Sequence, residues 1–152
     1  MKNEILLKLS LLVFTTVLFN CSSKNNSPSN EEIQLNKLNA TWNTASVMKD
    51  GVSQSGYDNL KLTLNGASSS KAYVYAVTGR PAKSPWPSGG SWTFGNDVIT
   101  QIIRDKGTAD ELPVSYSVTS NTLTLHFQFS GVGYVAGKVG EVSGNWSFVF
   151  TQ

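Results

Sequence analysis

Residues 122–130 read Thr-Leu-Thr-Leu-His-Phe-Gln-Phe-Ser, with an apolar side chain at every second position. A period of two puts one kind of side chain on each face of a strand, so this stretch predicts a half-buried antiparallel strand. The same alternation recurs in residues 58–65, 112–119 and 143–151. Turn dipeptides such as Asp50-Gly51 separate these segments. The pattern as a whole is typical of an all-β domain.

We expect eight strands, which comprise residues 41–49, 58–65, 71–78, 91–95, 98–104, 112–119, 122–130 and 143–151. Asn96-Asp97 predicts a tight hairpin between the fourth and the fifth of them. Consecutive short strands with close turns indicate an antiparallel up-and-down barrel, with a sandwich as the alternative. Closing a barrel removes the sheet edges, which suits a chain without long helices to cover them.

A short helix or helical turn is expected before the first strand, over residues 31–39. Asn30 is the expected N-cap, and Glu31 and Glu32 lie in the first turn, where the helix dipole favours acidic side chains. Apolar residues such as Leu38 give this segment an imperfect apolar side. We therefore expect it to pack against one end of the barrel.

The beginning of the chain has the layout of a secretory signal peptide. Lys2 and Lys8 lie near the start, the largely apolar run covers residues 5–19, and the only cysteine, Cys21, follows soon after. This order predicts a signal peptide over residues 1–20. A cysteine at the cut site resembles a bacterial lipoprotein signal, which implies that Cys21 carries a diacylglyceryl anchor. An ordinary signal peptide and an uncleaved anchor are the alternatives, although a transmembrane helix needs about 20 apolar residues.

The resemblance to a lipoprotein implies a membrane partner and a location. The chain would be lipid-anchored in the outer membrane, on the periplasmic face or at the cell surface. Residues 21–32 would then comprise the lipidated cysteine and a flexible tether, because Ser, Asn and Lys dominate its first part. Residues 33–152 would form a single barrel domain, which we expect to be a monomer.

Composition and charge argue against several classes of function. The chain has 12 basic and 10 acidic residues with no charged run, so it lacks the basic face of a nucleic-acid-binding protein. His126 is the only histidine, and it lies on the polar phase of its strand, where it should face solvent. One histidine and one cysteine cannot form a familiar zinc site, and no nucleophile motif is readable. We expect no metal, no cofactor and no enzymatic activity.

A small residue stands two positions before a tryptophan at the start of three predicted strands. The tryptophans in these motifs are Trp42, Trp92 and Trp146. Glycine or alanine allows the backbone to turn sharply at a barrel corner, and a large aromatic side chain two residues later can fill one end of the core. We expect all three tryptophans to be buried.

Three blocks of sequence carry a resemblance to a family: Leu38-Asn-Ala-Thr-Trp42, Pro85-Trp-Pro-Ser-Gly-Gly-Ser-Trp-Thr-Phe94 and Gly144-Asn-Trp-Ser-Phe148. They are similar to the opening, the proline-tryptophan loop and the closing strand of lipocalin-like lipoproteins of Bacteroidetes. The resemblance spans about residues 33–152. It implies a lipocalin-like barrel of eight strands, and its motifs are structural.

Two predicted loops, over residues 79–89 and 131–143, are longer than the others and are the candidates for function. The first contains three prolines around Trp86. Trp86 either caps the barrel mouth or presents an aromatic ring to a partner, because flanking prolines exclude it from a paired strand. Arg80 and Lys83 would suit an acidic head group on an apolar tail. The candidate ligand-binding residues are Arg80, Trp86, Tyr73, Tyr75, Arg104 and Tyr116, with Arg104 contributing if it faces inward.

Three functions remain open from the sequence. The first is a tethered module that binds a small apolar or amphipathic molecule in the barrel or at its mouth, which requires room that inward side chains do not fill. The second is a solid barrel that acts as an interaction or structural protein of the cell envelope, with no small-molecule ligand. The third, which we expect least, is a hydrolase or isomerase whose carboxylates are brought together by the fold.

Overall fold

The computed structural model describes residues 27–134 and 142–152 of the chain. Cys21 and the predicted signal peptide lie outside these residues. The described elements are α1 (Asn30–Leu38), β1 (Ala40–Lys49), β2 (Val52–Ser53), β3 (Lys61–Ala67), β4 (Ala72–Thr78), β5 (Gly89–Phe94), β6 (Gln101–Arg104), β7 (Leu112–Val118), β8 (Thr122–Phe129) and β9 (Gly144–Thr151). In this part of the chain, no helix is long and apolar enough to cross a membrane.

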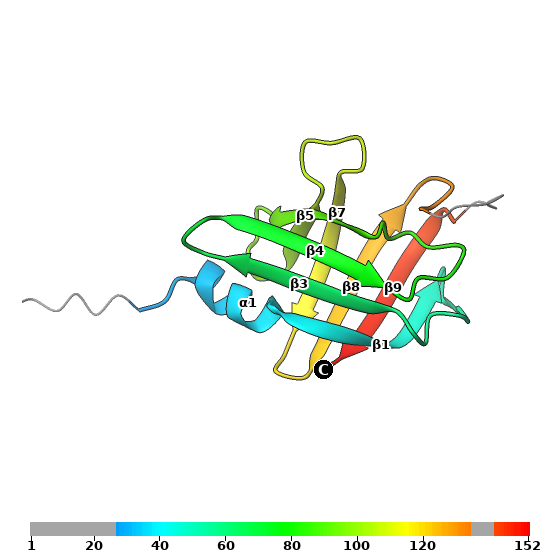
Figure 1. The fold of residues 1–152 in the computed structure, drawn as a ribbon, viewed down its shortest axis with the longest axis horizontal. Coiled ribbons are helices and arrows are strands. Elements are labelled where there is room, and N and C mark those ends of the chain that lie inside the picture. Colours follow the sequence, from blue (N-terminus) through cyan, green and yellow to red (C-terminus); the bar gives the residue numbers. More distant parts are fainter. Residues whose placement is uncertain (1–26, 135–141) are drawn as a thin grey trace, which may run out of the picture.

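Eight of the strands close into an antiparallel barrel, as the sequence predicts (Figure 1). From β3 to β9 each strand pairs with the next one along the chain. β1 closes the ring: its first residues pair with β3, and the segment from Asn43 to Lys49 pairs with β9. A shift of register between Thr44 and Ser46 marks a bulge, which bends β1 so that it serves both neighbours. The two-residue β2 only extends β1 beyond the ring.

The up-and-down order places alternate connections at opposite ends of the barrel. We call one end the helix end, because α1 packs there beside the short turns that follow β3, β5 and β7 (Figure 1). We call the other the loop end, because the longer connections 50–60, 79–88 and 105–111 lie there with the one that follows β8. Function tends to lie on such loops, which a rigid scaffold positions.

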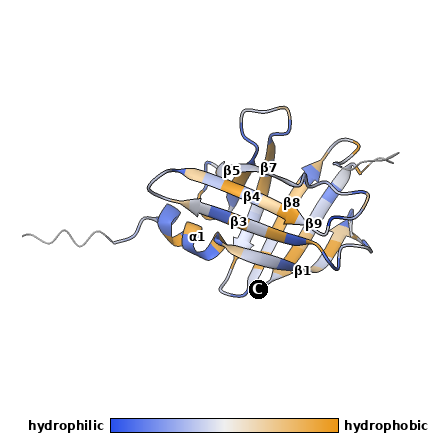
Figure 2. Ribbon diagram, in the orientation of Figure 1, coloured by the Kyte–Doolittle hydropathy of each residue, from blue (hydrophilic) through white to orange (hydrophobic). Residues whose placement is uncertain are grey.

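Aromatic and aliphatic side chains fill the barrel interior. The ring of Phe148 stacks on those of Phe127, Trp146 and Phe150, with centroids 5.7–5.8 Å apart. Figure 2 shows hydrophobic and hydrophilic positions mixed along each strand, as expected when one face is buried. Burying each such side chain contributes about 1.5–3 kcal/mol. The interior of this barrel is therefore a packed core.

The three predicted tryptophan plugs are confirmed. Trp42, Trp92 and Trp146 are at most 3% exposed. Each indole N–H donates to a backbone carbonyl: that of Trp42 to Leu38, and that of Trp146 to Val142. The N–H of Trp92 donates to a carbonyl on the neighbouring strand β4. Pairing the polar atom in this way removes the penalty of burying it.

Two local predictions are wrong. The N-cap of α1 is Ser29, whose hydroxyl accepts a hydrogen bond from the Glu32 amide, so Asn30 is the first helical residue. Both residue types cap well, and sequence alone does not choose between neighbours. The predicted strand 98–104 begins only at Gln101. The Asp97 carboxylate accepts from the Ile99 amide and the Thr100 hydroxyl, which builds a local turn in place of the tight hairpin.

Candidate functional site

The six candidate ligand residues do not form one site. Tyr73 and Tyr116 lie toward the helix end, where the hydroxyl of Tyr73 donates to Glu31 of α1 and that of Tyr116 donates to the Val98 carbonyl. The other four, Arg80, Trp86, Tyr75 and Arg104, gather at the loop end. There they close this end of the barrel, and a pocket lies beside them.

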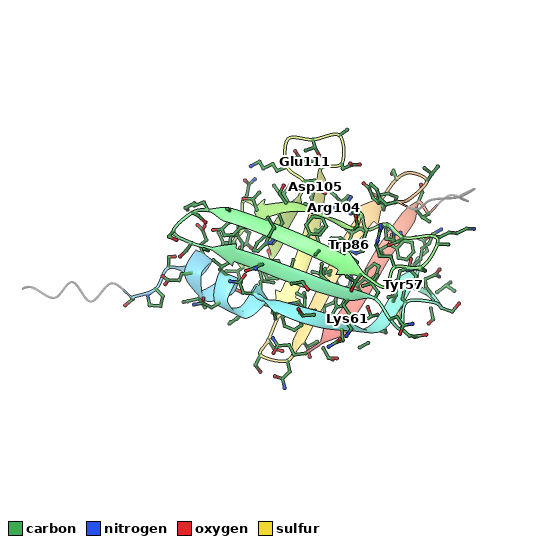
Figure 3. The ribbon with its side chains drawn as sticks, viewed as in Figure 1. Tyr57, Lys61, Trp86, Arg104, Asp105 and Glu111 are labelled. Atoms are coloured by element: carbon green, nitrogen blue, oxygen red, sulfur yellow. The ribbon has the colours of Figure 1, made fainter. Side chains whose placement is uncertain are left out.

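Trp86 closes the loop end from within. The connection between β4 and β5 turns its side chain into the barrel, where it is only 2% exposed (Figure 3). Its ring meets those of Tyr75, Phe127 and Phe148 edge to face, with centroids 5.6–6.4 Å apart. The sequence allowed Trp86 either to cap the barrel mouth or to present its ring to a partner, and its geometry is that of a cap. Trp86 does not present its ring to a partner.

Arg104 lies beneath this cap with its guanidinium inside the barrel. Its position at the end of β6 faces inward, and the side chain is 1% exposed. One terminal nitrogen donates to the Pro85 carbonyl at 2.8 Å, and the other donates to the Tyr134 hydroxyl at 3.0 Å. The guanidinium carbon lies 5.3 Å from the ring centroids of both Trp86 and Tyr134. The arginine thus joins three segments of the loop end.

Asp105 balances the buried positive charge. Its Oδ2 lies 3.4 Å from Nε of Arg104 and accepts a hydrogen bond from the Tyr75 hydroxyl at 2.6 Å. Its Oδ1 accepts from the Ser91 amide at 2.9 Å. Burial and then the hydrogen bond to Asp105 raise the pKa of Tyr75 above its ordinary value. Figure 3 shows Arg104 and Asp105 side by side beneath the connection after β6.

Glycine is required next to this carboxylate. A Cβ atom on Gly90 would stand 2.1 Å from Oδ1 of Asp105 and 2.7 Å from the Tyr75 hydroxyl. Asp105 itself has a left-handed backbone, with φ of 50°, a region that aspartate tolerates better than most residues. The pair of Gly90 and Asp105 therefore fits the network into the narrow space between β5 and β6.

Arg80 acts as a clamp between two loops. Its Nη1 donates to the carbonyls of Trp86 and Tyr134, each at 2.8 Å. These bonds tie the connection after β4 to the connection after β8. The side chain is half-buried, and its donors are directed at backbone. Arg80 thus holds the seal in place, and the prediction that it meets a ligand head group finds no direct support in this geometry.

A pocket of about 460 Å³ lies beside the clamp, between the connections 50–60 and 79–88. Two aromatic residues at its base are almost fully buried, Tyr57 and Trp146, whose ring centroids are 5.9 Å apart. The Tyr57 hydroxyl donates to the Lys83 carbonyl at 2.7 Å and fixes the loop above it. The lining residues are Lys49, Gln54, Ser55, Tyr57, Pro81, Ala82, Lys83, Val142 and Trp146. We call this space the mouth pocket.

The sequence pointed to only part of this pocket. Lys83 belongs to the predicted loop, but Lys49 and Tyr57 come from other segments and were not among the candidates. The available signal was an aromatic residue, Tyr57, within the polar stretch Ser53–Asp58. An aromatic side chain in such a stretch commonly folds back onto the domain. Its contact with Lys83 depends on loops that meet only when the barrel closes.

Two further hollows lie elsewhere on the described surface. One of about 340 Å³ at the loop end is lined by Asp110, Glu111 and Tyr134 among others. The second, of about 430 Å³, lies on the outer wall around His126. Within residues 27–134 and 142–152, no group of three or more His, Cys, Asp or Glu side chains could hold a metal ion.

Comparisons of the chain with protein-family models, with curated proteins and with solved structures gave no significant match. The functional argument therefore depends on the geometry of the chain itself.

Proposed function

We propose that this protein is a membrane-anchored, lipocalin-like lipoprotein that binds a small amphipathic anion in the mouth pocket. The anchor in this proposal is the diacylglyceryl group on Cys21, supported by the apolar run and the polar tether in the sequence. The domain would bind its ligand near the membrane surface, where molecules with an acidic head and an apolar tail are concentrated.

The packed interior directs the proposal to the mouth of the barrel. Eight-stranded barrels hold either their own side chains or one small ligand. Here the stacked aromatic rings around Phe148 occupy the centre, and Trp86 closes the loop end above them. A ligand inside the barrel would have to displace that core. A ligand in the mouth pocket would leave that core in place.

The observation that carries the proposal is the lining of the mouth pocket, which combines an apolar base with two lysines. Aromatic and aliphatic surface comes from Tyr57, Trp146 and Pro81, while Lys49 and Lys83 supply the only charges among the described lining residues. Burial of a tail contributes about 0.8 kcal/mol per CH₂ group. The lysines add attraction for an anionic head, which salt screens.

A fluorescent fatty acid tests this function. We expect saturable binding by the full-length chain in detergent micelles, with affinity at least tenfold lower for Lys49→Glu and for Lys83→Glu. The matched control is Lys61→Glu, which reverses an equal charge on the outer wall of β3 and should bind as the parent does. An alcohol of the same chain length should bind more weakly than the acid. Equal binding by parent and pocket variants would contradict the proposal.

The anchor is tested separately by Cys21→Ser, followed by fractionation of the tagged protein. Loss of the variant from the membrane fraction is the expected result, because two acyl chains give durable anchoring where an unmodified serine gives none. If the variant stays in the membrane fraction as fully as the parent, another part of the chain attaches the protein to the membrane.

A second candidate function is a solid envelope protein that acts only through protein contacts. The filled interior favours it, because such a protein needs no cavity. The fatty-acid titration separates the two, since this candidate requires that the parent not bind. We expect no enzymatic activity in either case: Asp105 and Asp110 both accept hydrogen bonds from tyrosine hydroxyls, which ties them to the seal.

A further inference from the structure

The loop end carries a second hollow, of about 340 Å³, which shares no lining residue with the mouth pocket. Its volume lies at the low end of the range of small-molecule sites, about 300–1,000 Å³. The connection 105–111 and the connection that follows β8 form much of its wall. We call it the Tyr134 hollow. Its lining includes Arg104, Asp110, Glu111, Phe129, Val132 and Tyr134.

Arg104 has more hydrogen-bond donors than the described residues accept. A guanidinium carries five N–H groups. Arg104 makes two bonds of 3.0 Å or less, to the Pro85 carbonyl and the Tyr134 hydroxyl, while its contact with the Asp110 carbonyl is 3.4 Å long. Nε lies 3.4 Å from Oδ2 of Asp105 but makes no hydrogen bond among the described residues. Buried donors are normally bonded, so a side chain that is 1% exposed and has unbonded N–H groups points to a ligand that can accept from it.

Two carboxylates line the same hollow. Neither Asp110 nor Glu111 takes part in an ion pair among the described residues. Oδ1 of Asp110 accepts from the Tyr134 hydroxyl at 2.7 Å, and Oε2 of Glu111 accepts from the Gly107 amide, also at 2.7 Å. These bonds orient both carboxylates and leave the second oxygen of each without a hydrogen bond in the described part of the chain. The hollow therefore offers negative charge to a cationic group.

The opposite charges of the hollow lie on either side of one hydroxyl group. The Tyr134 oxygen accepts from Nη2 of Arg104 at 3.0 Å and donates to Oδ1 of Asp110 at 2.7 Å. A ligand that contacts both charges must therefore carry its own anion and cation close together. A carboxylate suits the guanidinium and an ammonium group suits the aspartate, because hydrogen bonds between charged groups are the strong ones.

We infer that the Tyr134 hollow binds a free α-amino acid with an apolar side chain. One carbon atom separates the two charged groups of such a molecule, which matches the close spacing of Arg104 and Asp110. The carboxylate would accept from Nη2 of Arg104 in place of the long contact with the Asp110 carbonyl. The side chain would lie on Val132, which is 63% exposed, near Phe129. A simple anion would meet two carboxylates, and a simple cation would leave the buried donors unbonded.

Calorimetric titration of the full-length chain in non-ionic detergent micelles tests this inference. The probes are L-leucine, L-valine, L-methionine and L-phenylalanine, and we expect saturable binding of at least one. Three matched ligands each change one feature: the N-acetyl derivative of the tightest-binding amino acid lacks the cation, its amide lacks the anion, and 6-aminohexanoate holds both charges far apart. Each of the three should bind at least tenfold more weakly than that amino acid.

Two variants place the binding in this hollow. Asp110→Asn and Glu111→Gln each remove a negative charge but keep an oxygen for the hydrogen bond from Tyr134 or Gly107. We expect each variant to lose at least fivefold in affinity for the amino acid. Asp58→Asn is the matched control, because it removes a carboxylate from another connection of the loop end and should leave affinity unchanged. All three positions are exposed, so thermal unfolding should show that the variants fold.

Three outcomes would overturn the inference. They are no binding of any of the four amino acids, equal affinity for any of the three matched ligands, and equal affinity of the parent and both carboxylate variants. Equal affinity for the amide would assign the hollow to simple cations, and equal affinity for the N-acetyl derivative would assign it to simple anions. Fatty-acid binding is measured separately at the mouth pocket, so failure there leaves this result intact.

Discussion

The two ends of the barrel are closed by different means. At the helix end, Leu35 and Leu38 of α1 are at most 3% exposed and cover the core with aliphatic surface. The ion pair at this end lies on the outside, where Lys71 and Glu31 are 3.2 Å apart. At the loop end, Trp86 covers an ion pair that is itself buried, formed by Arg104 with the next residue in the chain.

Because the two closures differ, a substitution that removes a side chain destabilises the protein by a different amount at each end. Removing part of an apolar cover costs the buried area and the cavity left behind. Removing one partner of a buried ion pair also leaves the other charge without compensation, which costs about 3–5 kcal/mol. The loop end has the costlier closure, and it also has the mouth pocket and the hollow beside Tyr134.

The largest expected loss of stability comes from removing the buried cation that helps to close the loop end. Arg104→Met keeps apolar volume but leaves Asp105 without its cation, and we expect a loss of about 3–5 kcal/mol in the free energy of unfolding. Urea denaturation of the parent and the variant measures this loss. Asp105→Asn is the partner variant, since asparagine tolerates the left-handed backbone at that position.

The double variant Arg104→Met/Asp105→Asn decides whether charge is the cause. With no uncompensated charge inside, it should lose less than the sum of the two single variants, with a coupling of about 1–3 kcal/mol. Strict additivity would mean that the seal depends on packing alone, and the contrast between the two ends would disappear.

An intermediate loss of stability is expected from substitutions of Trp42 and Trp86, whose indole rings close the two ends of the barrel. The N–H of Trp42 donates to the Leu38 carbonyl at 3.0 Å, whereas that of Trp86 has no partner among the described residues. Replacing either tryptophan by phenylalanine removes the same volume. We therefore expect Trp42→Phe to cost about 1 kcal/mol more than Trp86→Phe, the worth of one hydrogen bond. Equal losses in urea denaturation would show that the Trp86 indole does have a partner.

The smallest effect concerns acid stability at the helix end. The hydrogen bond from Tyr73, followed by that from Lys71, lowers the pKa of Glu31 below its ordinary value of 4.5. A lowered pKa stabilises the folded protein above the ordinary value, and this contribution is lost as the pH falls through the lowered pKa. Because the pair is partly exposed, we expect it to contribute less than about 1 kcal/mol.

Glu31→Gln should remove that contribution. The stability difference between parent and variant, measured by urea denaturation, should therefore shrink as the pH is lowered from 6 to 3. Glu32→Gln on the exposed side of the same helix is the control, and its difference from the parent should change less. A difference for Glu31→Gln that is constant with pH would contradict the ionic role of this residue.

Much of the fold could be predicted from local patterns. The alternation in residues 122–130 becomes β8, and most of the other predicted strands agree with the observed ones to within two residues at each end. Two strands begin three residues later than predicted, β3 at Lys61 and β6 at Gln101. The burial of Trp42 and the exposure of His126 also follow from the phase of their strands. These features depend only on residues close together in the sequence, because successive side chains of a strand point to opposite faces.

The candidate site was harder to predict. The loop around Trp86 and the inward position of Arg104 follow from prolines and strand phase, but the roles of these residues do not. Arginine is a residue type that commonly contacts anionic ligands, but Nη1 of Arg80 donates to two backbone carbonyls. The mouth pocket needed Tyr57, which lies 26 positions from its partner Lys83. No local signal connects such residues.

The sequence by itself therefore determined the class of the fold, the number of barrel strands and the apolar phase of each, because these depend on periodicity and turn chemistry. Only the tertiary structure decided that the interior is filled and that Asp105 neutralises Arg104. It also decided that the Tyr134 hydroxyl lies between Arg104 and Asp110. These features depend on closure and register, which fix contacts between residues far apart in the chain.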